Sequence, residues 1–105
     1  MQIPLQITVR GMEHSAILDQ RIREKVQALE RFHSRIVCCR VTVAELDRHQ
    51  RQGRQFDVRV DVRMPGHGEI VVSRQHDEDL NVALRDAFDV AVRQIEDSVR
   101  LKRDR

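Results

Sequence analysis

The sequence predicts an α+β fold with the element order β-α-β-β-β-α, in which a four-stranded mixed sheet carries two helices on one face. Hydrophobic periodicity is the first observation behind this prediction. Residues 15–32 and 79–100 have helical spacing, and four other segments alternate between apolar and polar residues. The second observation is that every strand has one polar face, so both helices must cover the opposite, apolar face.

The helix at residues 79–100 has the strongest pattern, and the rest of the chain is expected to cover its apolar side. Asp77 or Asp79 can serve as the N-cap, and Glu78 adds negative charge beside the positive end of the helix dipole. The helix would be roughly 30 Å long, which matches a strand of about nine or ten residues. Its apolar stripe consists of Leu80, Leu84, Phe88, Ala91, Val92, Ile95 and Val99.

The first strand and the first helix occupy the N-terminal third of the chain. Pro4 cannot donate to a ladder, which favours an edge strand or a strand start, and Gly11 ends the strand. Ser15 is the expected N-cap of a helix that runs to about Phe32. The inward residues are Ile3, Leu5, Ile7 and Val9 in the strand and Leu18, Ile22, Val26 and Leu29 in the helix. The strand–helix–strand connection favours a right-handed crossover and parallel pairing of the first two strands.

Three further strands are predicted in the middle of the chain, at residues 37–44, 56–64 and 68–74. A polar hairpin loop, residues 47–54, joins the first two of these, and Pro65-Gly66 fits a type II turn before the third. In the last strand Ile70 and Val72 are expected to face the core. Residues 75–78 are expected to lead into the long helix.

Length and composition indicate one domain, residues 1–105, with one modest core. Charged residues make up 34% of the chain, and no apolar run approaches the roughly 20 residues that span a bilayer, so no membrane contact is expected. The N-terminus lacks a signal pattern, which predicts a cytoplasmic protein. Cys38 and Cys39 are adjacent, which is not a disulfide framework; in a strand they point to opposite faces as two buried or half-buried thiols.

Catalytic motifs are absent from the sequence. There is no Gly-rich phosphate loop, no nucleophile elbow and no paired Cys–His spacing. His76-Asp77-Glu78-Asp79 is the densest group of metal-ligand types, but helix capping and dipole charge explain its acids. We therefore expect no enzyme, no catalytic residue, no metal site, no cofactor and no small-molecule substrate.

Basic residues carry the functional signal. Net charge is only +2, but all except two of the 19 basic residues are arginine, which suits planar contact with phosphate. A high-GC genome would explain the arginine usage equally well. The first helix is net basic, and the alternative to a binding face is a solvated face with i,i+4 pairs. With only three Phe and no Trp or Tyr, a base-stacking platform is not expected.

Several segments resemble the ribosome hibernation-promoting factor family, also called ribosome-associated inhibitor A, protein Y or sigma-54 modulation protein. The similar segments are ITVRGME followed by SAILDQRIREKVQALERF, then GEIVVS, then DLNVALRDAFDVAVRQI. Leu29-Glu30, the basic Lys25 and Arg31, the helix-starting Asp79 and Arg93-Gln94 stand where the family pattern expects them. Their order, and gapless spacing within each helix, carry the resemblance over essentially the whole chain.

The resemblance implies a fold similar to that of double-stranded-RNA-binding domains and a function by binding. Family members bind the small ribosomal subunit and its 16S rRNA near the decoding centre. They inhibit or protect ribosomes under stress or in stationary phase by steric occlusion. The expected RNA-binding residues are Arg21, Arg23, Lys25, Arg31, Arg93, Arg100, Lys102 and Arg103.

The last helix departs most from the family pattern. Asn81 stands where the family usually has an aromatic residue, and Ala28 where it has a second basic residue in the first helix. Residues 96–98, EDS, interrupt the terminal basic run, and residues 79–99 are net acidic. We therefore expect the first helix to carry more of the binding. Long family members add a C-terminal dimerisation domain, and the sequence leaves open whether this chain is a short or a truncated form.

Two alternative functions remain open from the sequence. One is a general structured-RNA-binding module that uses Arg48, Arg51 and Arg54 of the hairpin loop. The other is a protein-interaction domain that self-associates through an exposed strand edge. Oligomeric state, the trigger for expression, and whether ribosomes would be dimerised or only occluded cannot be deduced from the sequence.

Overall fold

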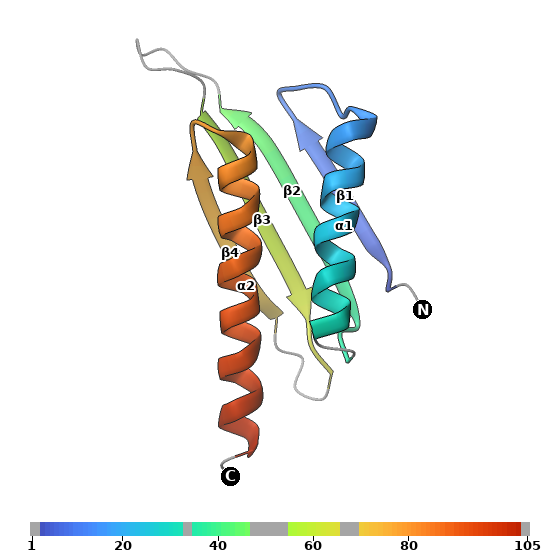
Figure 1. Ribbon diagram of the computed structural model, residues 1–105, viewed down its shortest axis with the longest axis vertical. Coiled ribbons are helices and arrows are strands. Elements are labelled where there is room, and N and C mark those ends of the chain that lie inside the picture. Colours follow the sequence, from blue (N-terminus) through green and yellow to red (C-terminus); the bar gives the residue numbers. More distant parts are fainter. Residues whose placement is uncertain (1–2, 33–34, 47–54, 66–69, 104–105) are drawn as a thin grey trace.

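A twisted sheet with two helices on one face forms the molecule, as the computed structural model in Figure 1 shows. The structure describes residues 3–32, 35–46, 55–65 and 70–103. The elements are β1 (Leu5–Arg10), α1 (Ala16–Phe32), β2 (Cys38–Leu46), β3 (Gln55–Arg63), β4 (Ile70–Asp77) and α2 (Leu80–Arg103). The predicted fold class is confirmed. The hairpin loop predicted at 47–54, the glycine of the turn at 65–66 and the start of the fourth strand at 68 lie outside the described residues.

The sheet follows the chain order β1-β2-β3-β4. β1 pairs with β2 in parallel, while β2 with β3 and β3 with β4 are antiparallel. α1 is the crossover between the two parallel strands, so it lies over their side of the sheet, and α2 lies over β3 and β4 (Figure 1). Pro4 stands directly before the edge strand β1, as its missing N–H requires, and its carbonyl accepts from the Cys39 N–H at 3.0 Å.

The core lies between the sheet and the helices. From β2 and β3 it takes valines with no exposed surface, Val41, Val43, Val58, Val60 and Val62. α1 contributes Leu18, Ile22, Val26 and Leu29, as its spacing predicts. α2 contributes Ala83, Leu84, Ala87, Phe88, Ala91 and Ile95. Three of these α2 residues are fully buried alanines, so the backbone of α2 can come closer to the sheet than that of α1.

The inward face of β4 corrects the sequence prediction. Val72 was expected to face the core, but it is 41% exposed, whereas Val71 and Ser73 on either side of it are buried. The Ser73 hydroxyl donates to the carbonyl of Ala87 in α2 at 2.7 Å. This bond satisfies the one polar side chain buried among the described residues, and it explains why a serine occupies a core position.

Several strand boundaries also differ from the prediction, and two of these differences change which residues enter the core or lead into α2. β4 continues through Asp77, which lies opposite Phe56 of β3, so residues 75–77 are strand rather than a lead-in to the helix. At the other boundary, Val37 lies just before β2 and is 45% exposed, while Ile36 enters the core in its place. The Val37 N–H donates to the Arg63 carbonyl at 2.9 Å, so the chain joins the sheet before its side chains begin to alternate.

Helix starts and one glycine fix the connections. Ser15 Oγ accepts from the Leu18 N–H at 3.1 Å, and Asp79 Oδ1 accepts from the Asn81 N–H at 2.9 Å, so both predicted N-caps are present. Gly11 has a φ of 73°, and a Cβ there would lie 2.7 Å from the Glu45 carbonyl oxygen. The turn after β1 therefore passes β2 at a distance that only glycine allows.

Candidate nucleic-acid interface

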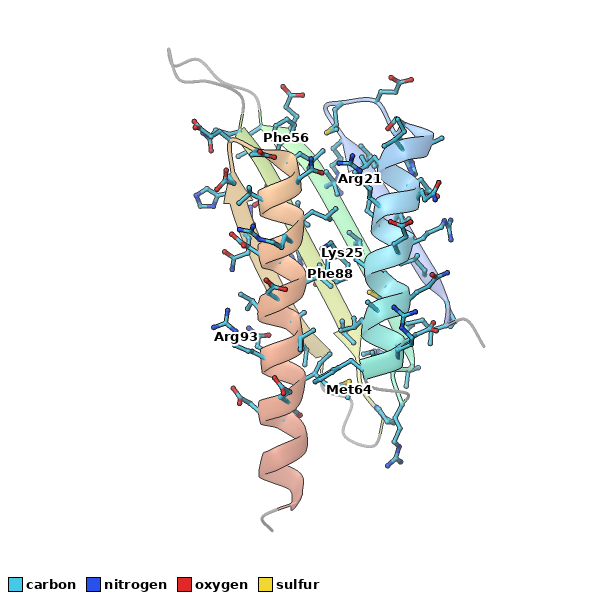
Figure 2. All side chains as sticks on the ribbon, in the orientation of Figure 1. Arg21, Lys25, Phe56, Met64, Phe88 and Arg93 are labelled. Carbon is cyan, nitrogen blue, oxygen red and sulfur yellow. The ribbon has the colours of Figure 1, made fainter. Side chains whose placement is uncertain are left out.

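A groove between α1 and α2 brings together basic side chains from both helices. It has a volume of about 500 Å³, and its lining residues are Arg21, Glu24, Lys25, Ala28, Asn81, Val82, Leu84 and Arg85. Three cationic side chains face one carboxylate in this set, so the groove is net basic. The sequence predicts Arg21 and Lys25 at the border of the α1 stripe, and Figure 2 shows both on the side of α1 toward α2.

Arg21 and Asn81 connect the two walls of the groove. The Arg21 guanidinium donates through Nη1 to Asn81 Oδ1 across the gap between the helices. This contact orients a planar cation at the mouth of the groove while leaving other guanidinium N–H groups for a ligand. Asn81, a polar residue at the start of α2, thereby positions the arginine.

Lys25 and Arg85 supply the other two positive charges. Lys25 is half-buried, because its stem packs beside the helix interface while its ammonium group can remain in water. Arg85 donates to Asp86 Oδ1 at 3.2 Å, but both side chains are well exposed, 60% and 41%, and such pairs are weak. A phosphate can therefore compete for the Arg85 guanidinium.

Arg23 lies away from the groove. Its Nε donates to Asp19 Oδ2 at 2.6 Å, and His14 contacts the other oxygen of the same carboxylate at 2.9 Å. The Arg23 hydrogen bond, followed by that of His14, holds the pKa of Asp19 below its usual value. Arg23 also lines a small hollow with Ile3 and Leu5, on the β1 side of α1.

The remaining expected RNA-binding residues are spread over the surface. Arg31 is exposed in the last turn of α1. Arg93 is exposed, and Figure 2 shows it on the side of α2 that faces away from α1. Arg100, Lys102 and Arg103 lie on the final turns of α2, and their side chains lie outside the description. The structure thus brings together Arg21 and Lys25 but does not join Arg23 or Arg93 to them.

Arg85 is the groove residue that the sequence reasoning missed. It lies four residues after Asn81 and directly after the buried Leu84, so it borders the α2 stripe as Lys25 borders the α1 stripe. That periodic signal was available in the sequence. What the sequence did not give was which border of the α2 stripe would face α1.

Other chemistry finds little support in the described part of the chain. No group of three metal-ligating side chains occurs there, and no helix there is long and apolar enough to cross a membrane. Burial, followed by the nearby Cys38 and Asp61, raises the pKa of the Cys39 thiol to about 12. This thiol therefore stays protonated at neutral pH and behaves as a small core residue.

Comparison with known proteins decides the family. A family model described as sigma 54 modulation protein / S30EA ribosomal protein matches residues 5–102. The chain belongs to this family. The predicted relationship is thereby confirmed over nearly the whole S30EA-family chain, although a search of curated proteins finds no match to the sequence.

Two solved structures show the same fold as this S30EA-family chain. The Protein Y N-terminal domain from Thermus thermophilus is 21% identical with a TM-score of 0.71, covering 90% of this chain and 96% of that one. A ribosomal subunit interface protein from Coxiella burnetii is 14% identical with a TM-score of 0.76, covering 91% of this chain and 97% of that one. The likeness at such low identity establishes the architecture of sheet and helices.

Proposed function

We propose that this S30EA-family chain binds the small ribosomal subunit through its 16S rRNA near the decoding centre, and inhibits or protects ribosomes under stress or in stationary phase. The observation that carries the proposal is the groove between α1 and α2, where Arg21, Lys25 and Arg85 face one carboxylate. The ribosomal description of the family, and the related subunit interface protein, support the ribosome as the partner. The proposed place of action is the cytoplasm.

The mechanism is binding without catalysis. Guanidinium and ammonium groups on a rigid helix pair can contact phosphates of structured RNA, which fixes the position of the protein but reads no bases. The molecule measures 50 × 26 × 19 Å, so a bound copy excludes other ligands from a volume of that size. Occlusion needs only affinity and shape, which agrees with the absence of stacked aromatic side chains on the described surface of the groove.

Co-sedimentation with ribosomes tests the proposal. The full chain is centrifuged with 30S subunits, 50S subunits and intact ribosomes at a series of salt concentrations. Because contact is expected with about four to six phosphates, the logarithm of affinity should fall with the logarithm of salt with a slope of roughly −3 to −5. Co-migration with 50S subunits alone, or a flat salt response, contradicts the proposal.

A free RNA duplex serves as the control in the same experiment. Equal affinity for the duplex and for the 30S subunit would favour a general structured-RNA-binding module instead. A mass that rises with protein concentration in the absence of RNA would favour self-association, for which β1 and β4 offer the two edges of the sheet.

A further inference from the structure

The face of the sheet opposite the helices carries an unexpected excess of arginine. The outward positions of the strands alternate with the core valines, and five of them are arginines: Arg10, Arg40, Arg59, Arg63 and Arg74. Only two described acids share this face, Asp57 and Asp61. The open face is therefore basic even though the whole chain is nearly neutral.

Both acids on the open face are already neutralised by neighbours. Asp61 accepts from Arg59 Nε at 2.9 Å, and Asp57 accepts from Arg74 Nε at 3.1 Å. The acids are the more buried partners, with side chains 19% and 15% exposed, so they sit beneath the arginines that pair with them. Within the described residues, Arg10, Arg40 and Arg63 are left on this face without an ion-pair partner.

Two of the unpaired arginines share one depression. It has a volume of about 410 Å³ at one end of the sheet, and its lining residues are Pro4, Leu5, Gln6, Cys38, Cys39, Arg40, Asp61 and Arg63. Arg40 lies on β2 and Arg63 on β3, at cross-strand positions opposite Asp61 and Cys38 respectively. Because the Asp61 carboxylate already pairs with Arg59, the two guanidinium groups in the depression, those of Arg40 and Arg63, keep their positive charge uncompensated.

We propose that this arginine depression binds backbone phosphate of a second RNA segment, so that the protein holds RNA on both of its faces. The helix groove lies on one side of the sheet and the depression on the other. The shortest dimension of the molecule is 19 Å, so the two RNA segments would run on opposite sides of a thin slab. The proposal goes beyond the proposed function, which uses the helix layer alone.

The composition of the open face favours nucleic acid over a protein partner. Protein interfaces have an apolar core, with aromatic residues enriched. Among the described outward residues, the large exposed apolar ones are Val72 and Leu46, on different strands, and no aromatic residue joins them. Nucleic-acid interfaces are more polar and much more positive, and planar guanidinium groups match phosphate oxygens two at a time.

A bridging experiment tests the proposal with the full chain. Two RNA duplexes of about 16 base pairs, one labelled with a donor and one with an acceptor fluorophore, are mixed with protein, and energy transfer reports both duplexes on one molecule. Arg40→Gln/Arg63→Gln should abolish energy transfer at moderate salt while one duplex still binds. For the bridging step, the slope of the logarithm of affinity against the logarithm of salt concentration should become less steep by about 2, and by about 1 for each single substitution.

Arg74→Gln is the matched control for each single substitution, because it removes the same charge from the same face at an arginine that is paired with Asp57 outside the depression. It should change the slope by less than about 1. Absence of bridging by the unmodified chain, or a loss in Arg74→Gln equal to that in Arg40→Gln and in Arg63→Gln, overturns the proposal. Unlabelled duplex and poly-glutamate are compared as competitors of the energy transfer. If poly-glutamate abolishes it as effectively as unlabelled duplex does, the assignment of the depression to RNA is also overturned. Free duplexes replace ribosomes here, so failure of the ribosome co-sedimentation test leaves this result independent.

Discussion

Helices α1 and α2 lie side by side on the same face of the sheet, but they are held there in different ways. α2 presents three fully buried alanines and the large Phe88 to β3 and β4, so it packs at short range over much of its length. α1 presents four larger aliphatic residues to the core, Leu18, Ile22, Val26 and Leu29, and no buried alanine among its described residues. One helix is thus a closely packed support, and the other is a helix whose long basic side chains border its core stripe.

The charges of the two helices are also arranged differently. In α1, acids and bases are interspersed, and Arg21 and Lys25 fall on the side toward α2. In α2, Arg85 and Arg93 stand among four acids through Ser98, and Arg100, Lys102 and Arg103 follow only at its end. We therefore predict that α2 contributes most to stability and that α1 contributes most to the proposed RNA binding.

Charge reversal should give the largest effect and can break this comparison. Lys25→Glu/Arg31→Glu should abolish ribosome pelleting at moderate salt, because phosphate is then repelled at two points of α1. Arg93→Glu should weaken pelleting much less, since Arg93 points away from the groove. Circular dichroism checks that each variant is folded. Loss of binding by Arg93→Glu together with retention by the double variant would reverse the ranking of the helices.

Arg85 sharpens the same test within α2. Arg85→Glu lies in the groove and should weaken pelleting more than Arg93→Glu, although both change the charge of the same helix equally. Equal effects of the two reversals would show that only the overall charge of α2 matters, and that the groove is not the contact surface.

Deletion of the Phe88 ring should have the next largest effect and tests the supporting role of α2. Phe88 is 4% exposed, and Phe88→Ala should lower the free energy of unfolding by about 3–5 kcal/mol. Phe32, at the end of α1 and 48% exposed, is the control, and Phe32→Ala should cost about 1 kcal/mol or less. Urea denaturation measures both. Similar midpoints for the two variants would contradict the assignment of α2 as the support.

Enlarging an alanine tests how closely α2 is packed against the sheet. Ala91 has no exposed surface, so Ala91→Leu should overpack the layer between α2 and the sheet and cost about 1–3 kcal/mol. Ala28→Leu adds the same atoms at an exposed position of α1 in the open groove, and should stay within about 0.5 kcal/mol of the unmodified chain. Equal thermal denaturation midpoints for the two variants would contradict close packing of α2 against the sheet at Ala91.

The smallest effect is expected at the start of α1. Arg23 and His14 lower the pKa of the partly exposed Asp19 carboxyl. Its contribution to stability is therefore present above the usual Asp pKa and is lost as the pH falls through the lowered value. NMR titration of the Asp19 carboxyl should give a midpoint below 3.8 that moves upward in Arg23→Ala. A midpoint that does not respond to this substitution would contradict the ion-pair explanation.

Periodicity predicted the elements well where one face is apolar and the other polar. The alternation of β3 matches the buried residues position by position. In α2 the predicted Leu84, Phe88, Ala91 and Ile95 are buried, whereas Ala83 and Ala87 are buried although the predicted stripe did not include them. The prediction for β4 was wrong because Ile70, Val71 and Val72 form a continuous apolar run, which does not show which residues face the core. The residue that decides this is Ser73, which carries a hydroxyl group. A buried serine is read as outward in a sequence, because its partner, the Ala87 carbonyl, is visible only in three dimensions.

The candidate site could be predicted only in part for a similar reason. Arg21 and Lys25 follow from the α1 stripe alone, but their partnership with Asn81 and Arg85 depends on how α2 is rotated about its axis. The arginine depression was not predicted from the sequence either. Alternating charges along β3 indicate a solvated face, yet ion pairing within and between strands determines which of those charges remain uncompensated.

The hydrogen bond from Ser73 to the Ala87 carbonyl has a mechanical consequence. Apolar contacts are not directional, so they tolerate small shifts of a helix along a sheet. The evenly spaced alanines 83, 87 and 91 would by themselves not fix the position of α2 along the strands. A directional hydrogen bond at one point along α2 favours the position in which the Ser73 hydroxyl meets the Ala87 carbonyl, and the buried Phe88 beside it favours the same position. Asn81 and Arg85 lie on the same helix, so their position is fixed with it. The buried Ser73 hydroxyl therefore fixes the position of α2 along its own axis, and with it the place where the cations of the two helices meet.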